Sequence, residues 1–143
     1  MSMPDDFDFI ETVLKAADER LANGTVTKLT PEEKVASDIW AATGTIGNGS
    51  FQYFFECELD AEISAQAYDV IGLPEGARLF RLALSLFPNN SPHEDVVERL
   101  AYIEQHEEAF DSLGMELVRL DRQMEALLAA YLRRAGYQIH ARV

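Results

Sequence analysis

The residues best suited to bind a cation stand around position 60, where carboxylates alternate with other residues: Glu56, Glu58, Asp60 and Glu62. Hard cations such as Ca²⁺ need several carboxylate oxygens within one short loop, and this spacing resembles the first ligands of a calcium loop. With Glu56 as the first position, however, Ala61 stands at the obligatory glycine and Ala67 at the closing glutamate. We therefore expect no metal here, but an acidic helix start that Asp60 caps, with Glu62 near the positive end of the helix dipole.

Two histidines stand beside carboxylates, in the pairs His93-Glu94 and His106-Glu107, while the third, His140, lies near the C-terminus. Neither pair has the His-Glu-x-x-His spacing that brings two imidazoles onto one face of a helix and so onto one zinc ion. Ser50 is not part of a Gly-x-Ser-x-Gly elbow, and no base is evident beside it. The sequence thus predicts a protein that is not an enzyme and has neither a metal nor a cofactor.

Glycines at 44, 47 and 49 resemble a phosphate-binding loop, but the preceding residues have a helical pattern and no Gly-Lys-Ser/Thr follows. We instead expect residues 44–50 to connect two elements, with Asn48 or Gly49 at positive φ. The structural motif that starts there consists of Asn48, Gly49, Ser50, Phe51, Gln52, Tyr53 and Phe54. Phe51 is expected to anchor the turn in the core. Residues 51–55 form a short helix or a strand, and the helical neighbours favour the helix.

The chain of 143 residues has 25 Asp plus Glu against 12 Lys plus Arg, a formal net charge of -13. An acidic surface of this kind repels nucleic acid and anionic lipid, because both are polyanions, and attracts basic proteins. No apolar run approaches the roughly 20 residues of a membrane span. The N-terminus has neither the basic nor the apolar region of a secretory signal, so we expect a cytoplasmic location. Cys57, the only cysteine, is predicted to be a half-buried hydrophobe.

Apolar residues recur at helical spacing along almost the whole chain, which predicts one compact all-α domain over residues 1–143 with about six helices. The first helix ends at Asn23-Gly24. The second begins at a capping box of Thr30 and Glu33, with Pro31 in its first turn.

The later helices are predicted from similar signals. Asp60 caps a helix that Gly72 stops, and the next helix, from Pro74 to before Phe87, is apolar on most sides and is expected to be the central one. A second capping box, Ser91-Pro92-His93-Glu94, opens a helix to about Asp111. The last helix has an apolar stripe over residues 113–131, which we interpret as core-facing in preference to a coiled-coil seam.

In the order of its motifs, the chain resembles the bacterial DNA-mimic protein family of acidic proteins. The family's hallmark is a helix, an Asn-Gly-Gly-Phe turn that leads into Gln-Tyr/Phe-Phe, and a helix that ends in Ile-Gly. The corresponding residues run from about Leu29 to Tyr131: Leu29-Thr30, Asn48-Gly49-Ser50-Phe51-Gln52-Tyr53-Phe54, Tyr68-Asp69-Val70-Ile71-Gly72, Phe87-Pro88, Phe110-Asp111, Leu120-Asp121 and Tyr131. Two departures are that Ser50 replaces the second glycine and that Gln52 follows Phe51 directly, where one residue would intervene. The resemblance implies an all-helical fold and, for at least one member, an acidic surface that occupies the DNA site of a transcription factor.

Carboxylates three or four residues apart on a helix lie about 5–6 Å apart at Cβ, a spacing that can imitate a row of DNA phosphates. One predicted row consists of Glu94, Glu98, Glu104, Glu108 and Asp111, and a second consists of Glu56, Glu58 and Glu62. The simpler interpretation is that all of these are solvated carboxylates without a dedicated role. We expect a non-catalytic module that binds a basic protein partner, either by imitating DNA or, as the alternative, as an immunity-type partner that recognises shape.

Overall fold

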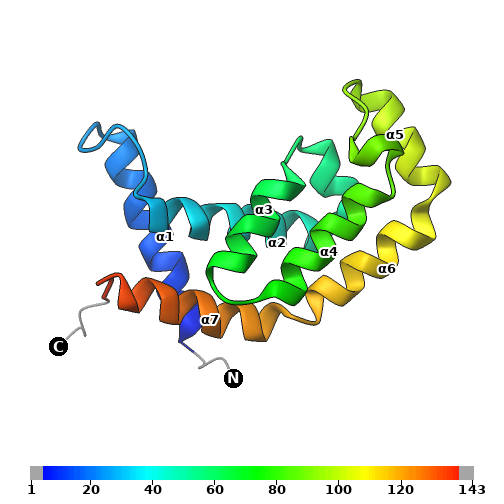
Figure 1. Cartoon of the computed structure of the whole chain (residues 1–143). Coiled ribbons are helices and arrows are strands. Elements are labelled where there is room, and N and C mark those ends of the chain that lie inside the picture. The colour runs from blue at the N-terminus through cyan, green and yellow to red at the C-terminus, as the bar shows by residue number, and fades with distance from the viewer. Residues whose placement is uncertain (1–4, 139–143) are drawn as a thin grey trace.

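Helices form the regular structure of the protein (Figure 1). The computed structural model describes residues 5–138, which contain α1 (Asp6–Ala22), α2 (Pro31–Glu56), α3 (Ala61–Val70), α4 (Pro74–Ser85), the 3-10 helix η1 (Pro88–Asn90), α5 (Val96–Gln105), α6 (Glu107–Val118) and α7 (Asp121–Arg134). Within these residues there is no strand, so the predicted all-α fold is confirmed, with seven α-helices in place of about six. Their apolar faces share one core. None of the described helices combines the length and the apolar character needed to cross a bilayer.

The central helix is α2, which contacts α1, α3, α5, α6 and α7. The expectation that residues 74–86 provide the central helix is wrong. α4 packs against α3 and α6 and leaves Arg78, Arg81 and Leu82 exposed. The apolar pattern of α4 is wider than the face its neighbours cover, because Leu82 lies in solvent and Leu84 is only half-buried.

The predicted signals at several helix ends are confirmed. The side chain of Thr30 accepts a hydrogen bond from the backbone N–H of Glu33, whose carboxylate accepts one from the N–H of Thr30. The carboxylate of Asp60 accepts a hydrogen bond from the N–H of Ile63 at the start of α3. After α3, Gly72 has a φ of 86°, which allows the chain to leave the helix. Each of these ends is set by residues close together in the sequence.

The glycine-rich stretch, expected to connect two elements, is helical. α2 continues to Glu56 with a kink at Gly49 (φ −155°, ψ 23°) and Ser50 (φ 62°, ψ −169°), so the positive φ falls on Ser50 and not on Asn48 or Gly49. Each glycine disfavours a helix by about 1 kcal/mol relative to Ala. Ile46, however, is buried on the core-facing side of this segment, and such packing outweighs propensity. Residues 51–55 are helical, as favoured.

Two boundaries in the second half of the chain also differ from the prediction. α5 begins at Val96 with Asp95 as its N-cap, so the predicted Ser91-Glu94 capping box does not form. The helix expected to reach Asp111 ends at Gln105, and His106, with a φ of −123°, separates α5 from α6. The break gives α6 its own direction, and Phe110 is fully buried in the core.

The apolar stripe over residues 113–131 is divided between α6 and α7, yet it faces the core in both helices. Leu117 and Met124 are fully buried, which confirms the core-facing interpretation over a coiled-coil seam. Cys57 differs from its prediction: it is exposed, because it follows the last residue of α2 at the surface.

The core at one end of the molecule is largely aromatic. The rings of Phe51, Phe54 and Phe55, all in the last turns of α2, have centroids between 5.1 and 6.0 Å apart. Phe80 of α4 lies 5.6 Å from both Phe51 and Phe54. Phe87 lies 5.0 Å from Phe55, so it joins the segment before α5 to the same core. This packing fixes the end of α2 relative to α4 and α5.

Candidate protein-binding surface

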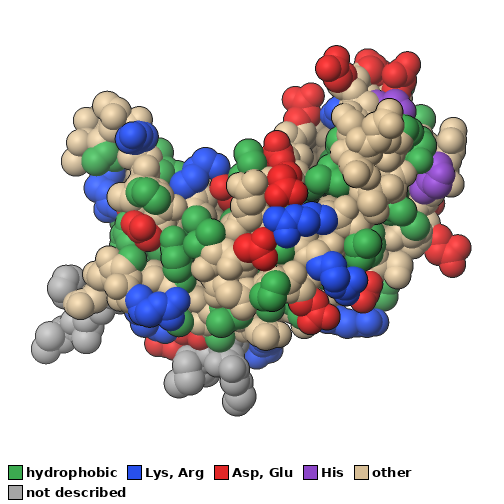
Figure 2. All heavy atoms as spheres, in the orientation of Figure 1, with side chains coloured by type: hydrophobic (Ala, Val, Ile, Leu, Met, Phe, Trp, Pro, Cys, Tyr) green, Lys and Arg blue, Asp and Glu red, His purple; other side chains and the backbone are tan. Residues whose placement is uncertain are grey.

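Most of the acidic residues predicted to bind a partner belong to α5, the start of α6 and the segments before α5 and after α2, which lie at the end of the molecule away from α1 (Figure 1). Figure 2 shows acidic side chains clustered over the start of α5 and over the connection from α2 to α3. We call this region the acidic end and define it by exposed carboxylates on α2, α5, α6 and the segments that flank them: Glu56, Glu58, Glu94, Glu98, Glu104, Glu107 and Glu108. Residues from both predicted rows therefore lie at the same end of the fold.

Few positive charges balance this end. Between Arg81 and Arg119 the only Lys or Arg is Arg99, whereas the same stretch contains many carboxylates: Glu94, Asp95, Glu98, Glu104, Glu107, Glu108, Asp111 and Glu116. Among the ion pairs of residues 5–138, none involves Glu94, Glu98, Glu104 or Glu108. Exposed carboxylates without a counter-charge create a negative potential that attracts a basic partner over roughly 8 Å at physiological ionic strength.

Arg99 holds the two parts of the acidic end together. Its Nε donates to the carbonyl of Phe55, at 3.0 Å, and its Nη1 donates to the carbonyls of His93 and Glu94, at 2.8 and 3.2 Å. Its Nη2 lies 3.7 Å from Oε1 of Glu58, and its side chain is only 7% exposed. Because one guanidinium joins the end of α2 to the segment before α5, it holds Glu58 close to the backbone of Glu94.

Sequence reasoning did not single out Arg99, although two signals point to it. It is the only Lys or Arg in a long acidic stretch, and it stands four positions before the buried Ile103, on the same face of α5. A charged residue on the buried face of a helix needs several hydrogen-bond partners, which the carbonyls at the end of α2 and before α5 provide. The same contacts hold residues 93 and 94 outside the helix, which explains why α5 begins only at Val96.

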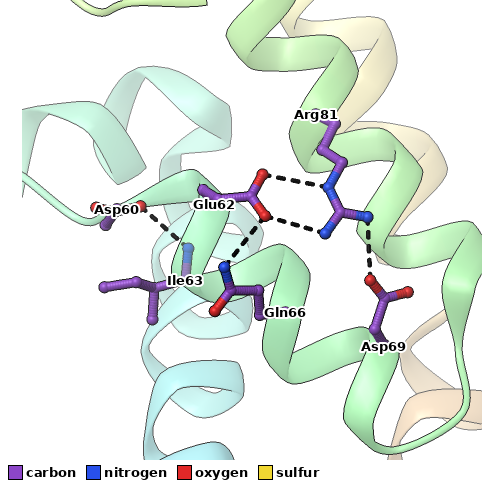
Figure 3. Close-up of polar contacts among 6 residues, drawn as sticks. All are labelled: Asp60, Glu62, Ile63, Gln66, Asp69 and Arg81. Atoms are coloured by element: carbon purple, nitrogen blue, oxygen red, sulfur yellow. Dashed lines mark hydrogen bonds and ion pairs between the residues drawn. The ribbon is translucent and has the colours of Figure 1, made fainter.

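Of the predicted site residues, Glu62 has the shortest ion pair, and it is with Arg81 (Figure 3). Nε and Nη2 of Arg81 in α4 donate to its two carboxylate oxygens at 3.2 and 3.0 Å, and Nη1 of Arg81 donates to Asp69 at 3.0 Å. The hydrogen bond from Arg81 lowers the pKa of the Glu62 carboxyl below its usual value. Glu62 therefore links α3 to α4, and it offers a partner less free charge than Glu56 or Glu58.

Asp111 also has a partner within the chain. Its Oδ1 accepts a hydrogen bond of 2.7 Å from Oγ of Ser50, and Asp111 is half-buried. The predicted row from Glu94 to Asp111 is not on one helix, because the break at His106 divides it between α5 and α6. The structure thus brings Glu94, Glu98, Glu104 and Glu108 to the exposed acidic end, whereas Asp111 connects α6 to the kink of α2.

The kink of α2 contains a strained residue. Ser50, at φ 62° and ψ −169°, occupies a region that is nearly restricted to glycine, and this conformation costs about 1–3 kcal/mol in other residues. Gly49 does not have the expected positive φ, but a glycine is required there for a steric reason. A Cβ atom at this position would lie 2.6 Å from Cβ of Tyr53. Within the predicted structural motif Phe51 and Phe54 are buried, whereas Asn48, Gln52 and Tyr53 are exposed.

We expect Ser50→Ala to destabilise the fold more than Ser50→Gly does. Alanine keeps the strained conformation and loses the hydrogen bond to Asp111, which lowers the free energy of unfolding by about 1–3 kcal/mol. Glycine loses the same hydrogen bond but relieves the strain, so we expect Ser50→Gly to be more stable than Ser50→Ala by about 1–3 kcal/mol. Urea unfolding of the two variants measures this difference, and equal midpoints would show that Ser50 is not strained.

The two histidines of the described segment serve as aromatic packing groups. His93 and His106 pack against the ring of Tyr102, with centroids 5.2 and 4.2 Å away. His140 lies outside the described residues. Within residues 5–138, no group of three or more His, Cys, Asp and Glu side chains is arranged to hold a metal ion.

Comparison with known proteins gives one match. The family model described as DMP19-like protein matches residues 27–135, a range that begins just before α2 and includes all of α7. No curated protein and no solved structure matches the chain. The matched range contains the kink, Arg99 and the whole acidic end, but not α1.

Proposed function

The chain belongs to the DMP19-like protein family, a DNA-mimic family, and we propose from this premise that its acidic end occupies the DNA-binding surface of a basic protein. In this role the protein is a non-catalytic binding module, and its partner is a DNA-binding protein. The net charge of -13 opposes direct binding of the protein to nucleic acid.

The observation that carries this proposal is the set of exposed carboxylates gathered from separate segments, of which Glu94, Glu98 and Glu104 form no ion pair within the described chain. The surfaces that bind DNA are lined with Lys and Arg side chains that contact phosphates. Carboxylates carry a negative charge, as phosphates do, and accept charge-assisted hydrogen bonds from these cations. Arg99 supports the arrangement from the inside, and its ion pair with Glu58 offsets only one of the carboxylates presented to a partner.

Displacement from DNA tests the proposed function. Duplex DNA on beads is loaded with the basic DNA-binding proteins of the source cell, and the purified protein is then added. We expect it to release at least one of them at low salt, with release declining steeply as salt is raised, because the attraction is screened. Any released protein is then tested for simultaneous binding of DNA and this chain.

Matched charge variants test whether displacement depends on the acidic end or only on the net charge of the protein. The test variant combines Glu94→Gln, Glu98→Gln and Glu104→Gln, and the control combines Asp8→Asn, Asp18→Asn and Glu19→Gln in α1, outside the family match. Both variants lose equal charge at exposed positions, where each substitution changes stability by less than about 0.5 kcal/mol. We expect only the test variant to lose displacement. Equal displacement by both variants, or a partner that binds DNA and this chain together, would contradict the proposal.

A further inference from the structure

A groove lies between the kink of α2 and the exposed side of α6. It has a volume of about 590 Å³ and is lined by residues that include Ile46, Gly49 and Ser50 on one side and Gly114, Met115, Val118 and Arg119 on the other. Arg119 follows the last residue of α6, so the positive charge lies at the opposite end of that helix from Glu107 and Glu108. Because the glycines have no side chains, backbone is accessible in the wall of the groove. The strained Ser50 and its hydrogen bond to Asp111 define where the two sides meet.

Exposed apolar side chains line part of the groove. Met115 and Val118, three positions apart on α6, are 60% and 43% exposed. Single exposed apolar residues are common, but these two line one hollow together with Ile46. Methionine is flexible and polarisable, so Met115 can adapt to the shape of an incoming apolar side chain.

Along α6 the groove continues into the acidic end. A second hollow shares Asp111 and Met115 with the first and adds Glu107 and Glu108, and a third extends from these two glutamates to Gln105. α6, yellow to orange in Figure 1, has 12 residues, so the line of hollows follows roughly 18 Å of helix axis. An occupant would meet apolar side chains first and carboxylates two or three turns away.

We propose that this groove receives an amphipathic basic helix of the partner, with its apolar side chains against Met115 and Val118 and its Lys or Arg side chains against Glu107 and Glu108. The inference rests on the proposed function, because it assigns a second contact to the same basic partner. Charge complementarity selects the occupant: a segment that follows α6 toward the acidic end must be positive there, and helix-in-groove binding provides apolar anchors at the matching spacing. Apolar burial adds affinity that salt does not screen.

A synthetic amphipathic helix of about 15 residues, with Leu on one face and Lys on the other, probes the groove directly. The reference probe is a scrambled peptide of the same composition and charge but without an apolar face. At high salt, where attraction to the net charge of the protein is screened, calorimetry is expected to show that the amphipathic peptide binds more tightly than the scrambled peptide. Equal affinity of the two peptides would overturn the proposal.

Paired variants locate the binding. Met115→Gln with Val118→Gln is expected to weaken binding of the amphipathic peptide by about tenfold or more, because the apolar contacts are lost without a change of charge. The control, Ile63→Gln with Val70→Gln, changes two exposed apolar residues on α3 and is expected to bind like the parent. If the Met115/Val118 variant binds the amphipathic peptide as tightly as the parent does, the peptide does not bind in the groove and the proposal is overturned.

The DNA-displacement assay distinguishes this inference from the function on which it rests. If the Met115/Val118 variant displaces DNA-binding proteins as the parent does, the groove is not used and the mimicry stands. If the Met115/Val118 variant loses peptide binding and the control variant does not, the groove binds an amphipathic helix. If, in addition, neither the parent nor any variant displaces a protein from DNA, the proposed DNA mimicry is wrong. Sedimentation of the parent and of the Met115/Val118 variant tests whether a second copy of this chain occupies the groove. If the parent is a dimer and the variant is a monomer, the groove is a dimer interface and the proposal is overturned.

Discussion

Arg99→Met is expected to lower the free energy of unfolding by about 3–5 kcal/mol, the usual effect of removing one partner from a buried charged contact. Methionine fills much of the space of the arginine stem, so the loss comes from hydrogen bonds and not from a cavity. The carbonyls of Phe55, His93 and Glu94 all lose their guanidinium donor. The end of α2 and the start of α5 are then no longer joined by this contact.

Urea unfolding at pH 7 measures this effect, with Arg78→Met as the matched control. Arg78 is exposed on α4 and its nearest carboxylate oxygen, on Glu75, is 4.0 Å away, so we expect the control to change stability by less than about 0.5 kcal/mol. Similar values for the two variants would show that Arg99 does not fix the acidic end. At a temperature where Arg99→Met stays folded, it should also displace less protein from DNA than Arg78→Met.

Phe51→Ala is expected to lower the free energy of unfolding by about 3–5 kcal/mol, because it removes a large buried side chain and leaves a cavity. The Phe51 ring is 0% exposed and lies within 6.0 Å of the rings of Phe54, Phe55 and Phe80. These rings surround it from α2 and α4, so the site cannot collapse without moving both helices. The effect follows from the kink at Gly49 and Ser50, which directs Phe51 inward.

Tyr53→Ala, two positions along the same helix, is the control for Phe51→Ala. Tyr53 is 41% exposed, and we expect its truncation to change stability by about 1 kcal/mol or less. Denaturant midpoints of the two variants measure the contrast. If Phe51→Ala unfolds like Tyr53→Ala and instead loses partner binding, the motif acts in recognition and not as an anchor of the core.

The helix ends that could be predicted from sequence are those whose contacts are local. Thr30 and Glu33 cap each other across one turn, Asp60 reaches the N–H of Ile63, and Gly72 supplies a positive φ. Such contacts form between residues within four positions of each other, so the order of residue types is enough to predict them. The same reasoning failed at residues 44–50, where glycine and asparagine favour a turn but the burial of Ile46 keeps the segment helical.

The contacts that shape the candidate surface are long-range. Arg99 binds the carbonyl of a residue 44 positions earlier, and Ser50 binds a carboxylate 61 positions later. No local pattern predicts these pairs, because they depend on how α2, α5 and α6 pack. The breaks at His106 and before Asp121 likewise follow from packing, and they explain why two predicted helices became α5, α6 and α7.

By itself, the sequence determined that the protein is all-helical and acidic, that its motifs follow the order of the DNA-mimic family, and which carboxylates were available. Helical periodicity and net charge are properties of the residue order and composition, so they exist before any tertiary contact forms. Only the tertiary structure decided which carboxylates remain free: Arg81 pairs Glu62, Ser50 holds Asp111, and Glu94, Glu98 and Glu104 stay exposed. The physical reason is that exposure and pairing depend on which helices are packed side by side, and at the acidic end that packing is fixed by the aromatic core and by Arg99.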